Sequence, residues 1–152
     1  MSRQLMTIGI LFVLLSTLPM AQADNLLMAR SPHAFPEAML ALQTSIHAHG
    51  YTVSRVQRVD VGLKRSGYQT DKYRIVFFGK ADEVRQLLQR HPQLAPYLPL
   101  KITLFAEQDD TLLTTFDPQM LRRLVPEPDM VAQLNHWEQD VLAILDDMRK
   151  GD

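Results

Sequence analysis

The chain has 152 residues, of which 46% are hydrophobic, and this predicts one globular domain with a substantial core. Lysine and arginine together number 16 against 17 aspartates and glutamates, so the formal net charge of -1 argues against a general nucleic-acid binder. The chain has no cysteine, which excludes disulfides, thiolate nucleophiles, zinc–thiolate sites, iron–sulfur clusters and haem attached through cysteine.

The N-terminus has the three-part pattern of a secretory signal peptide. Arg3 supplies a positive charge, an apolar run follows from Leu5 to Leu15, and Ala21 and Ala23 occupy the small-residue positions that a signal peptidase reads. We therefore predict a signal peptide over residues 1–23, export to the periplasm and no stable membrane anchor after cleavage. An uncleaved anchor is the alternative, but the apolar run is shorter than the ~20 residues of a spanning helix.

After residue 23 the chain predicts a strand and then a helix. Residues 25–30 form a short apolar run, which is typical of a strand. Pro36 suits the first helical turn, and Gly50 suits the helix end because glycine accepts a left-handed conformation. The helix has one apolar stripe, made of Phe35, Met39, Leu42 and Ile46. We expect this stripe to face the core.

Two strands follow, separated by a polar segment. Residues 51–60 alternate between apolar and polar side chains, with a phase slip near Val56 that predicts a bulge or a bend. Residues 61–71 are polar and contain glycine, which predicts a loop. Residues 72–79 are rich in aromatic and β-branched side chains and predict a strong strand.

The next segment predicts a short helix and a pair of strands. Residues 81–90 have apolar side chains at helical spacing, and a connection broken by prolines follows. Residues 101–107 and 111–117 predict two strands with a turn between them, and the strands run antiparallel if that turn is a hairpin.

A long helix is predicted over residues 130–149, which contain neither glycine nor proline. Its apolar seam consists of Met130, Leu134, Trp137, Val141, Ile144 and Met148. Pro126 and Pro128 separate this helix from the preceding chain, so it either docks on its own domain or swaps onto a partner. We expect docking within the chain, because neighbours in sequence usually pack together.

The predicted order is therefore β-α-β-β-α-β-β-α. This order indicates an α+β fold, in which helices pack on one face of a twisted, antiparallel-rich sheet. We expect the main α+β domain at residues 24–124 and the C-terminal helix at residues 125–152.

Alternation along the strands predicts two faces for the sheet. Phe77 and Phe78 are adjacent on one strand and must face opposite sides. The one turned away from the helices needs another cover, which a loop, a dimer partner or a ligand could supply. In the strand after Pro99, Leu100 and Ile102 share one face while Lys101 lies on the other.

No motif for catalysis or for metal binding is present. His47 and His49 are two residues apart, which does not suit a metal pair on a helix, and each methionine fits an apolar stripe or strand. We predict no catalytic residue, no metal site and no cofactor. The candidate ligand-binding residues are cationic or aromatic groups of the segment 64–74 and the start of a later strand, namely Lys64, Tyr73, Arg74 and Lys101.

Four segments together resemble the domain of unknown function 302 family: RVQRVDVGL, YRIVFFG, VRQLLQRHPQLAPYLPLKITLFAE and TLLTTFDP. The resemblance covers residues 26–123, and its most specific element is Leu98-Pro99-Leu100-Lys101 at the entry to a strand. The chain departs from the family pattern in two places, since Lys80-Ala81 replaces Asn-Pro and Val61 replaces a histidine. The resemblance implies a TATA-binding-protein-like arrangement of helices on a sheet, often dimeric, and no established enzyme activity.

We interpret the protein as an exported, non-enzymatic domain that binds a small ligand or a protein partner, with no role in nucleic-acid binding. Two alternatives stay open. One is an enzyme or enzyme accessory that uses the basic segment 64–74 and Lys101. The other is a structural module that forms a homodimer.

Overall fold

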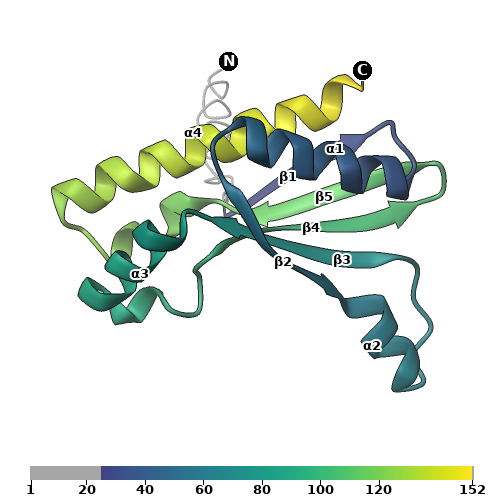
Figure 1. Ribbon diagram of the computed structural model, residues 1–152, viewed down its shortest axis with the longest axis horizontal. Helices are drawn as coiled ribbons and strands as arrows, with labels where there is room; N and C mark the ends of the chain where they lie inside the picture. Colours follow the sequence, from purple (N-terminus) through teal and green to yellow (C-terminus); the bar gives the residue numbers. More distant parts are fainter. Residues whose placement is uncertain (1–24, 152) are drawn as a thin grey trace, which may run out of the picture.

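A computed structural model describes residues 25–151 (Figure 1). The predicted signal peptide and its cleavage site lie outside the described residues. The strands are β1 (Leu26–Ser31), β2 (Thr52–Arg58), β3 (Tyr73–Gly79), β4 (Leu100–Glu107) and β5 (Asp110–Phe116). The helices are α1 (Phe35–Ala48), α2 (Val59–Arg65), α3 (Ala81–Arg90) and α4 (Pro128–Lys150), with short 3-10 helices η1 (Pro92–Leu94) and η2 (Pro118–Arg123).

The strands form one sheet in the order β1-β5-β4-β3-β2, and each neighbouring pair is antiparallel. This confirms the predicted α+β fold and the antiparallel hairpin between β4 and β5. The predicted bulge in β2 is also present, as a register shift between Val53 and Arg55. It lies slightly before Val56, since the pairing with β3 is regular again from Arg55 onward.

One prediction about the local structure is wrong. The sequence predicts a loop over residues 61–71, but α2 occupies residues 59–65 and only residues 66–71 lie outside regular secondary structure. The helix is short, contains Gly62 and has mostly half-buried apolar side chains, so its hydrophobic pattern is weak. Its first turn contains Asp60, whose buried carboxylate pairs with Arg74 of β3 and ties α2 to the sheet.

Helices α1 and α4 lie side by side on one face of the sheet, as Figure 1 shows, and the core lies beneath them. In the predicted stripe of α1, Phe35, Leu42 and Ile46 are buried and Met39 is half-buried. The predicted seam of α4 is buried throughout, and Leu145 joins it. The C-terminal helix therefore docks within its own chain, against β1, η2 and α1.

Strand alternation gives the sheet the two faces that the sequence predicts. Val76 and Phe78 of β3, with Ile102 and Leu104 of β4, point toward α1 and α4 and are fully buried. Phe77 points the other way and is half-buried. The chain enters β4 through a cis peptide bond between Leu98 and Pro99. Within residues 25–151, no helix combines the length and the apolar character that a membrane crossing requires.

Candidate functional site

The face of the sheet opposite α1 and α4 is the main candidate for binding, and we call it the open face. In Figure 1 the helices of the described residues leave its centre uncovered, and α2 and α3 lie toward the two ends of the sheet. Two large apolar side chains of β1 are exposed there, Leu26 at 54% and Met28 at 48%. Side chains that pair directly across antiparallel strands share a face, so the register defines the composition of the open face.

One row of the open face is aromatic and cationic. Lys101 of β4 pairs with Phe77 of β3, which in turn pairs with Arg55 of β2. On the other side, the register between β4 and β5 brings Phe116 toward Lys101. The neighbouring Thr115 hydroxyl donates a hydrogen bond of 2.6 Å to the backbone carbonyl of Lys101, which fixes this approach. We call this set the basic row.

The middle row is smaller and less charged. Thr103 of β4 pairs with Thr114 of β5 on one side and with Ile75 of β3 on the other. Met28 and Gln57 complete this row on the two edge strands. The three central side chains are half-buried, and they are smaller than the rings of the rows on either side. The row forms a low floor between two aromatic groups.

The third row is aromatic at its centre. Tyr73 of β3 pairs with Phe105 of β4, and their rings stack with centroids 4.4 Å apart. Leu112 of β5 pairs with Phe105 from the other side. Beyond this row the face becomes acidic, because Glu107 pairs with Asp110 across the hairpin. The open face therefore carries positive charge at one end and negative charge at the other.

The two ends differ in how their charges are compensated. Arg30 of β1 donates two hydrogen bonds to the Glu107 carboxylate, at 2.7 and 2.9 Å. In contrast, neither Lys101 nor Arg55 makes a salt bridge with any residue in the range 25–151. The basic row is thus the part of the open face with free positive charge.

The structure brings only two of the four predicted ligand-binding residues to the same face. Lys101 and Tyr73 both lie on the open face, but they belong to different rows, about 13 Å apart along the strands. Lys64 lies exposed on α2. Arg74 points to the opposite face, since it follows Tyr73 directly on β3.

Arg74 is part of a buried ion pair. Its guanidinium contacts the carboxylate of Asp60, donates to the Tyr73 carbonyl at 3.1 Å and lies 5.7 Å from the centre of the Phe35 ring. Burial lowers the pKa of Arg74, and the nearby charge of Arg58 lowers it further. With its side chain only 15% exposed and its charge neutralised by Asp60, Arg74 joins β3 to α2 and α1.

Two other polar clusters attach α4 to the rest of the fold. The Tyr51 hydroxyl donates a hydrogen bond of 2.6 Å to Asp140. Burial raises the pKa of Tyr51, and the bond to Asp140 raises it further, so the phenol stays protonated. The Ser45 hydroxyl donates to Asp147 at 2.7 Å, and the His49 ring lies 3.1 Å from the same oxygen. Serine and histidine both contact the carboxylate here, which differs from the relay order of a catalytic triad.

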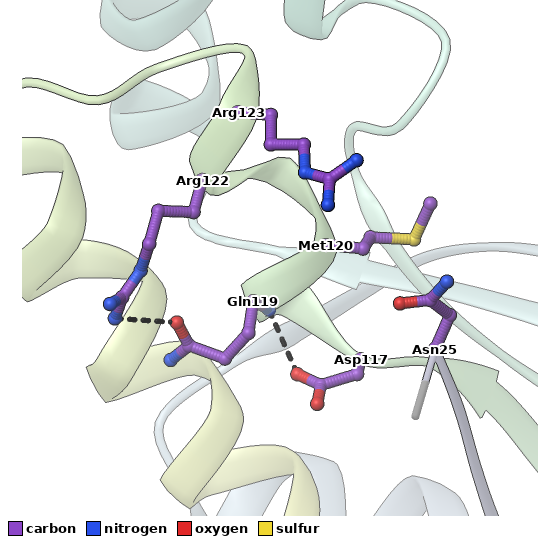
Figure 2. A pocket seen from close by; sticks show the side chains of 6 residues that line it. All are labelled: Asn25, Asp117, Gln119, Met120, Arg122 and Arg123. Carbon is purple, nitrogen blue, oxygen red and sulfur yellow. Dashed lines mark hydrogen bonds between the residues drawn. The ribbon is translucent and has the colours of Figure 1, made fainter. Parts of the chain in front are cut away.

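A polar hollow of about 470 Å³ lies at the end of β5, beside η2 (Figure 2). Its lining residues are Asn25, Asp117, Gln119, Met120, Arg122 and Arg123. Asp117 caps η2 by accepting the Gln119 backbone N–H at 2.8 Å, and Arg122 is held by the Gln119 side chain at 2.8 Å. Figure 2 shows both bonds within the rim of the hollow. These contacts stabilise η2.

Residues 25–151 contain no group of three histidine, aspartate or glutamate side chains placed to hold a metal ion.

Sequence reasoning missed the rows of the open face and the role of Asp60. Alternation along the strand after Pro99 separates Lys101 from Leu100 and Ile102, and the structure has the same two faces. The position of Phe116 beside Lys101 depends on strand order, which alternation does not reveal. For Asp60, an acidic residue at the start of a short helix gave no signal of its partner fourteen residues later.

The model of the family described as "Domain of unknown function DUF302" matches residues 28–148. The chain belongs to the DUF302 family. The match includes α4, so it extends beyond the residues 26–123 that carried the resemblance in the sequence.

A solved relative supports the fold. The crystal structure of an uncharacterized conserved DUF302 protein from Bacillus stearothermophilus aligns with a TM-score of 0.73 and 20% sequence identity. The alignment covers 84% of this chain and 100% of that chain. At this identity the likeness concerns the fold alone. No curated protein matches the chain.

Proposed function

We propose that this DUF302 protein is an exported, non-enzymatic binding domain, and that the open face of its sheet binds a small, largely apolar ligand. The observation that supports this is the asymmetry of the sheet. Helices α1 and α4 cover one face, whereas the other carries half-buried and exposed apolar side chains on β1, β3, β4 and β5. Apolar side chains that gather on an uncovered face typically mark an interaction site.

The polar clusters of the fold favour binding over catalysis. Asp60, Tyr51 and Asp147 each bond to a residue on another element and hold two elements together. Burial keeps the Tyr51 hydroxyl protonated, so it is unsuited to act as a base. The enzyme alternative uses the basic segment 64–74 and Lys101, and the cations Lys64, Arg74 and Lys101 lie on three different surfaces.

The proposal is tested with a neutral fluorescent probe, N-phenyl-1-naphthylamine, added to protein purified from cells that express the full chain. We expect the probe to bind the native protein and Ile75→Glu to abolish binding, because the new carboxylate lies at the centre of the open face. The matched control is Leu40→Glu on α1, where the side chain is already 69% exposed. Equal binding by both variants, with unchanged circular dichroism, would contradict the proposal.

A homodimer is the second candidate, and the charge pattern of the open face favours it. A twofold axis perpendicular to the strands would place the Lys101 end of one copy over the Glu107 and Asp110 end of the other. Five strands spaced ~4.8 Å apart, each ~7 residues long, give a face of about 570 Å², which approaches the ~800 Å² per partner of a standard interface.

Sedimentation equilibrium tests the dimer directly. If the open face forms the interface, the native protein should sediment as a dimer and Ile75→Glu as a monomer. A native protein that stays monomeric at high micromolar concentration would contradict the dimer. Ligand binding would then be the remaining proposal for the open face.

The export proposal rests on the N-terminal pattern alone. Cleavage after Ala23 should leave Asp24 as the first residue of the exported protein. Intact-mass analysis of periplasmic protein checks this, and a full-length mass in that fraction would contradict it.

A further inference from the structure

We propose that the ligand of the open face is an aromatic organic anion whose acid group is held by Lys101. This inference rests on the proposed function and adds the chemical class of the ligand. It uses three features of the basic row: the position of the ammonium group, its lack of compensation and the rings around it.

Lys101 lies between aromatic side chains on both neighbouring strands. Phe77 is its direct partner on β3, and Phe116 approaches from β5. Side chains in such positions have Cβ atoms about 4.5–5.5 Å apart, so the lysine stem is flanked by rings on both sides. Tyr97 extends this aromatic wall, because its ring lies 6.3 Å from that of Phe116 in an edge-on arrangement.

The positive charge of Lys101 is uncompensated within the part of the chain that the structure describes. No carboxylate of residues 25–151 lies within salt-bridge distance of its ammonium group, and the same holds for Arg55 in the same row. The carboxylates of the face lie at its opposite end, where Glu107 is already bound by Arg30. A half-buried cation beside apolar rings interacts more strongly with an anion than one in open water does, because the surrounding dielectric is lower.

The shape of the face favours an aromatic body for this anion. From Lys101 the floor of Thr103, Thr114 and Ile75 leads to the stacked pair of Tyr73 and Phe105. Each step between rows covers two residues, or about 7 Å, so a fused ring system of naphthalene size would lie over the floor between the ammonium and this pair. Ring edges and faces that remain half-buried are well placed for stacked or edge-on contacts with it.

The single ammonium group of Lys101 also restricts the kind of acid group that the ligand carries. Lysine acts as a point charge with rotatable donors, in contrast to the planar fork of arginine. A monoanionic carboxylate or sulfonate therefore fits better than a dianionic phosphate, which usually recruits several cations or backbone N–H groups.

A pair of probes with the same aromatic body tests this class. 1-Anilinonaphthalene-8-sulfonate is anionic, and N-phenyl-1-naphthylamine is its neutral counterpart. We expect the native protein to bind the anionic probe at least about tenfold more tightly, since a hydrogen bond to a charged group contributes about that factor. This comparison needs no variant and so does not depend on the folding of a mutant.

Variants then assign the effect to Lys101. Lys101→Met should weaken binding of the anionic probe about tenfold and change binding of the neutral probe less than about twofold. Lys101→Arg should retain most of the affinity for the anion. The matched control is Lys64→Met, which removes the same charge from α2, outside the open face.

The outcomes separate this inference from the proposed function. If both probes bind equally and Lys101→Met affects neither, the anionic class is wrong while the apolar binding face stands. If neither probe binds, or Ile75→Glu leaves both affinities unchanged, the binding face itself is wrong. Loss of anion binding in Lys64→Met to the same extent as in Lys101→Met would also overturn the assignment.

Discussion

The two faces of the sheet are made by the same strands, yet they differ in water access and in charge. On the covered face, Val76, Ile102 and Leu104 have no exposed surface. Their neighbours along the chain on the open face, such as Phe77 and Thr103, are half-buried. Because side chains alternate along a strand, this difference comes from what lies over each face and not from the strands themselves.

The two faces also differ in whether their polar side chains have bonding partners. Asp60, Ser45 and Arg74 are polar side chains on the covered side, and each bonds to a specific partner. In the described part of the chain, every buried side-chain nitrogen or oxygen has a hydrogen-bond partner. Lys101 and Arg55 on the open face make no salt bridge among residues 25–151. Buried polar groups need partners to be stable, whereas free charge at a half-exposed surface is available to a ligand.

The largest expected effect concerns the helix that covers the sheet. Trp137 lies in the middle of the α4 seam and is 1% exposed. Trp137→Ala should lower the free energy of unfolding by ~3–5 kcal/mol, because the substitution leaves a large cavity between α4 and the core. Chemical denaturation at two protein concentrations should give the same loss. A loss that grows on dilution would mean that α4 packs on a second molecule.

A matched pair of isoleucines compares the faces directly. Ile102 is fully buried on the covered face, and Ile75 is half-buried on the open face of the adjacent strand. Ile102→Ala should destabilise by ~2–5 kcal/mol. Ile75→Ala should cost about 1 kcal/mol, since much of its surface is not enclosed. Denaturation midpoints measure both, and equal losses would mean that the open face is covered in solution.

The covered face was the more predictable of the two. Helical periodicity identified Phe35, Leu42 and the α4 seam, because burial against a sheet requires an apolar stripe at that spacing. Alternation likewise separated Phe77 from Phe78. These features depend on residues that are near each other in the sequence, so the hydrophobic pattern of one sequence is enough to predict them.

The candidate site depended on long-range pairing and was only partly predictable. Lys101 and Tyr73 share the open face, but the expectation that Arg74 joins Tyr73 relied on proximity in the sequence, although adjacent strand residues face opposite sides. β1 pairs with β5, which lies much later in the sequence, and this pairing brings Leu26 beside Phe116. No local pattern specifies that pairing, because it depends on the packing of the whole sheet against α1 and α4.

The ion pair of Arg74 and Asp60 tests whether charge on the covered side is structural. Arg74→Met should destabilise by about 3–5 kcal/mol, because it leaves the buried Asp60 carboxylate without its partner. The double variant Asp60→Asn with Arg74→Met should recover part of the loss. Thermal denaturation of the single and double variants checks both expectations. An Arg74→Met variant with native stability that fails to bind the anionic probe would assign Arg74 to ligand binding after all.

The smallest expected effect lies at the polar junction of α1 and α4. The hydrogen bond from Ser45 lowers the pKa of the Asp147 carboxyl, as do His49 and Lys150, while partial burial opposes them. Because the folded pKa lies below the unfolded one, the ionised carboxylate stabilises the fold above the unfolded pKa of about 3.9. This contribution is lost as the pH falls through the folded pKa. The Asp147 side chain is 42% exposed, so solvent screening keeps the effect below ~1 kcal/mol.

Ser45→Ala and Asp147→Asn separate the parts of this junction. Ser45→Ala removes the strongest cause of the shift, so the pKa of Asp147 should move back toward its ordinary value. Asp147→Asn should lower stability slightly at neutral pH and make the loss of stability in acid less steep than in the native protein. Carboxyl titration by NMR and denaturation midpoints between pH 7 and about 2.5 measure the two effects. If Asp147 titrates at the same pH in the native protein and in Ser45→Ala, the serine hydroxyl does not bond to it in solution. The polar contact between α1 and α4 would then rest on His49 and Asp147, beside the apolar packing of the two helices.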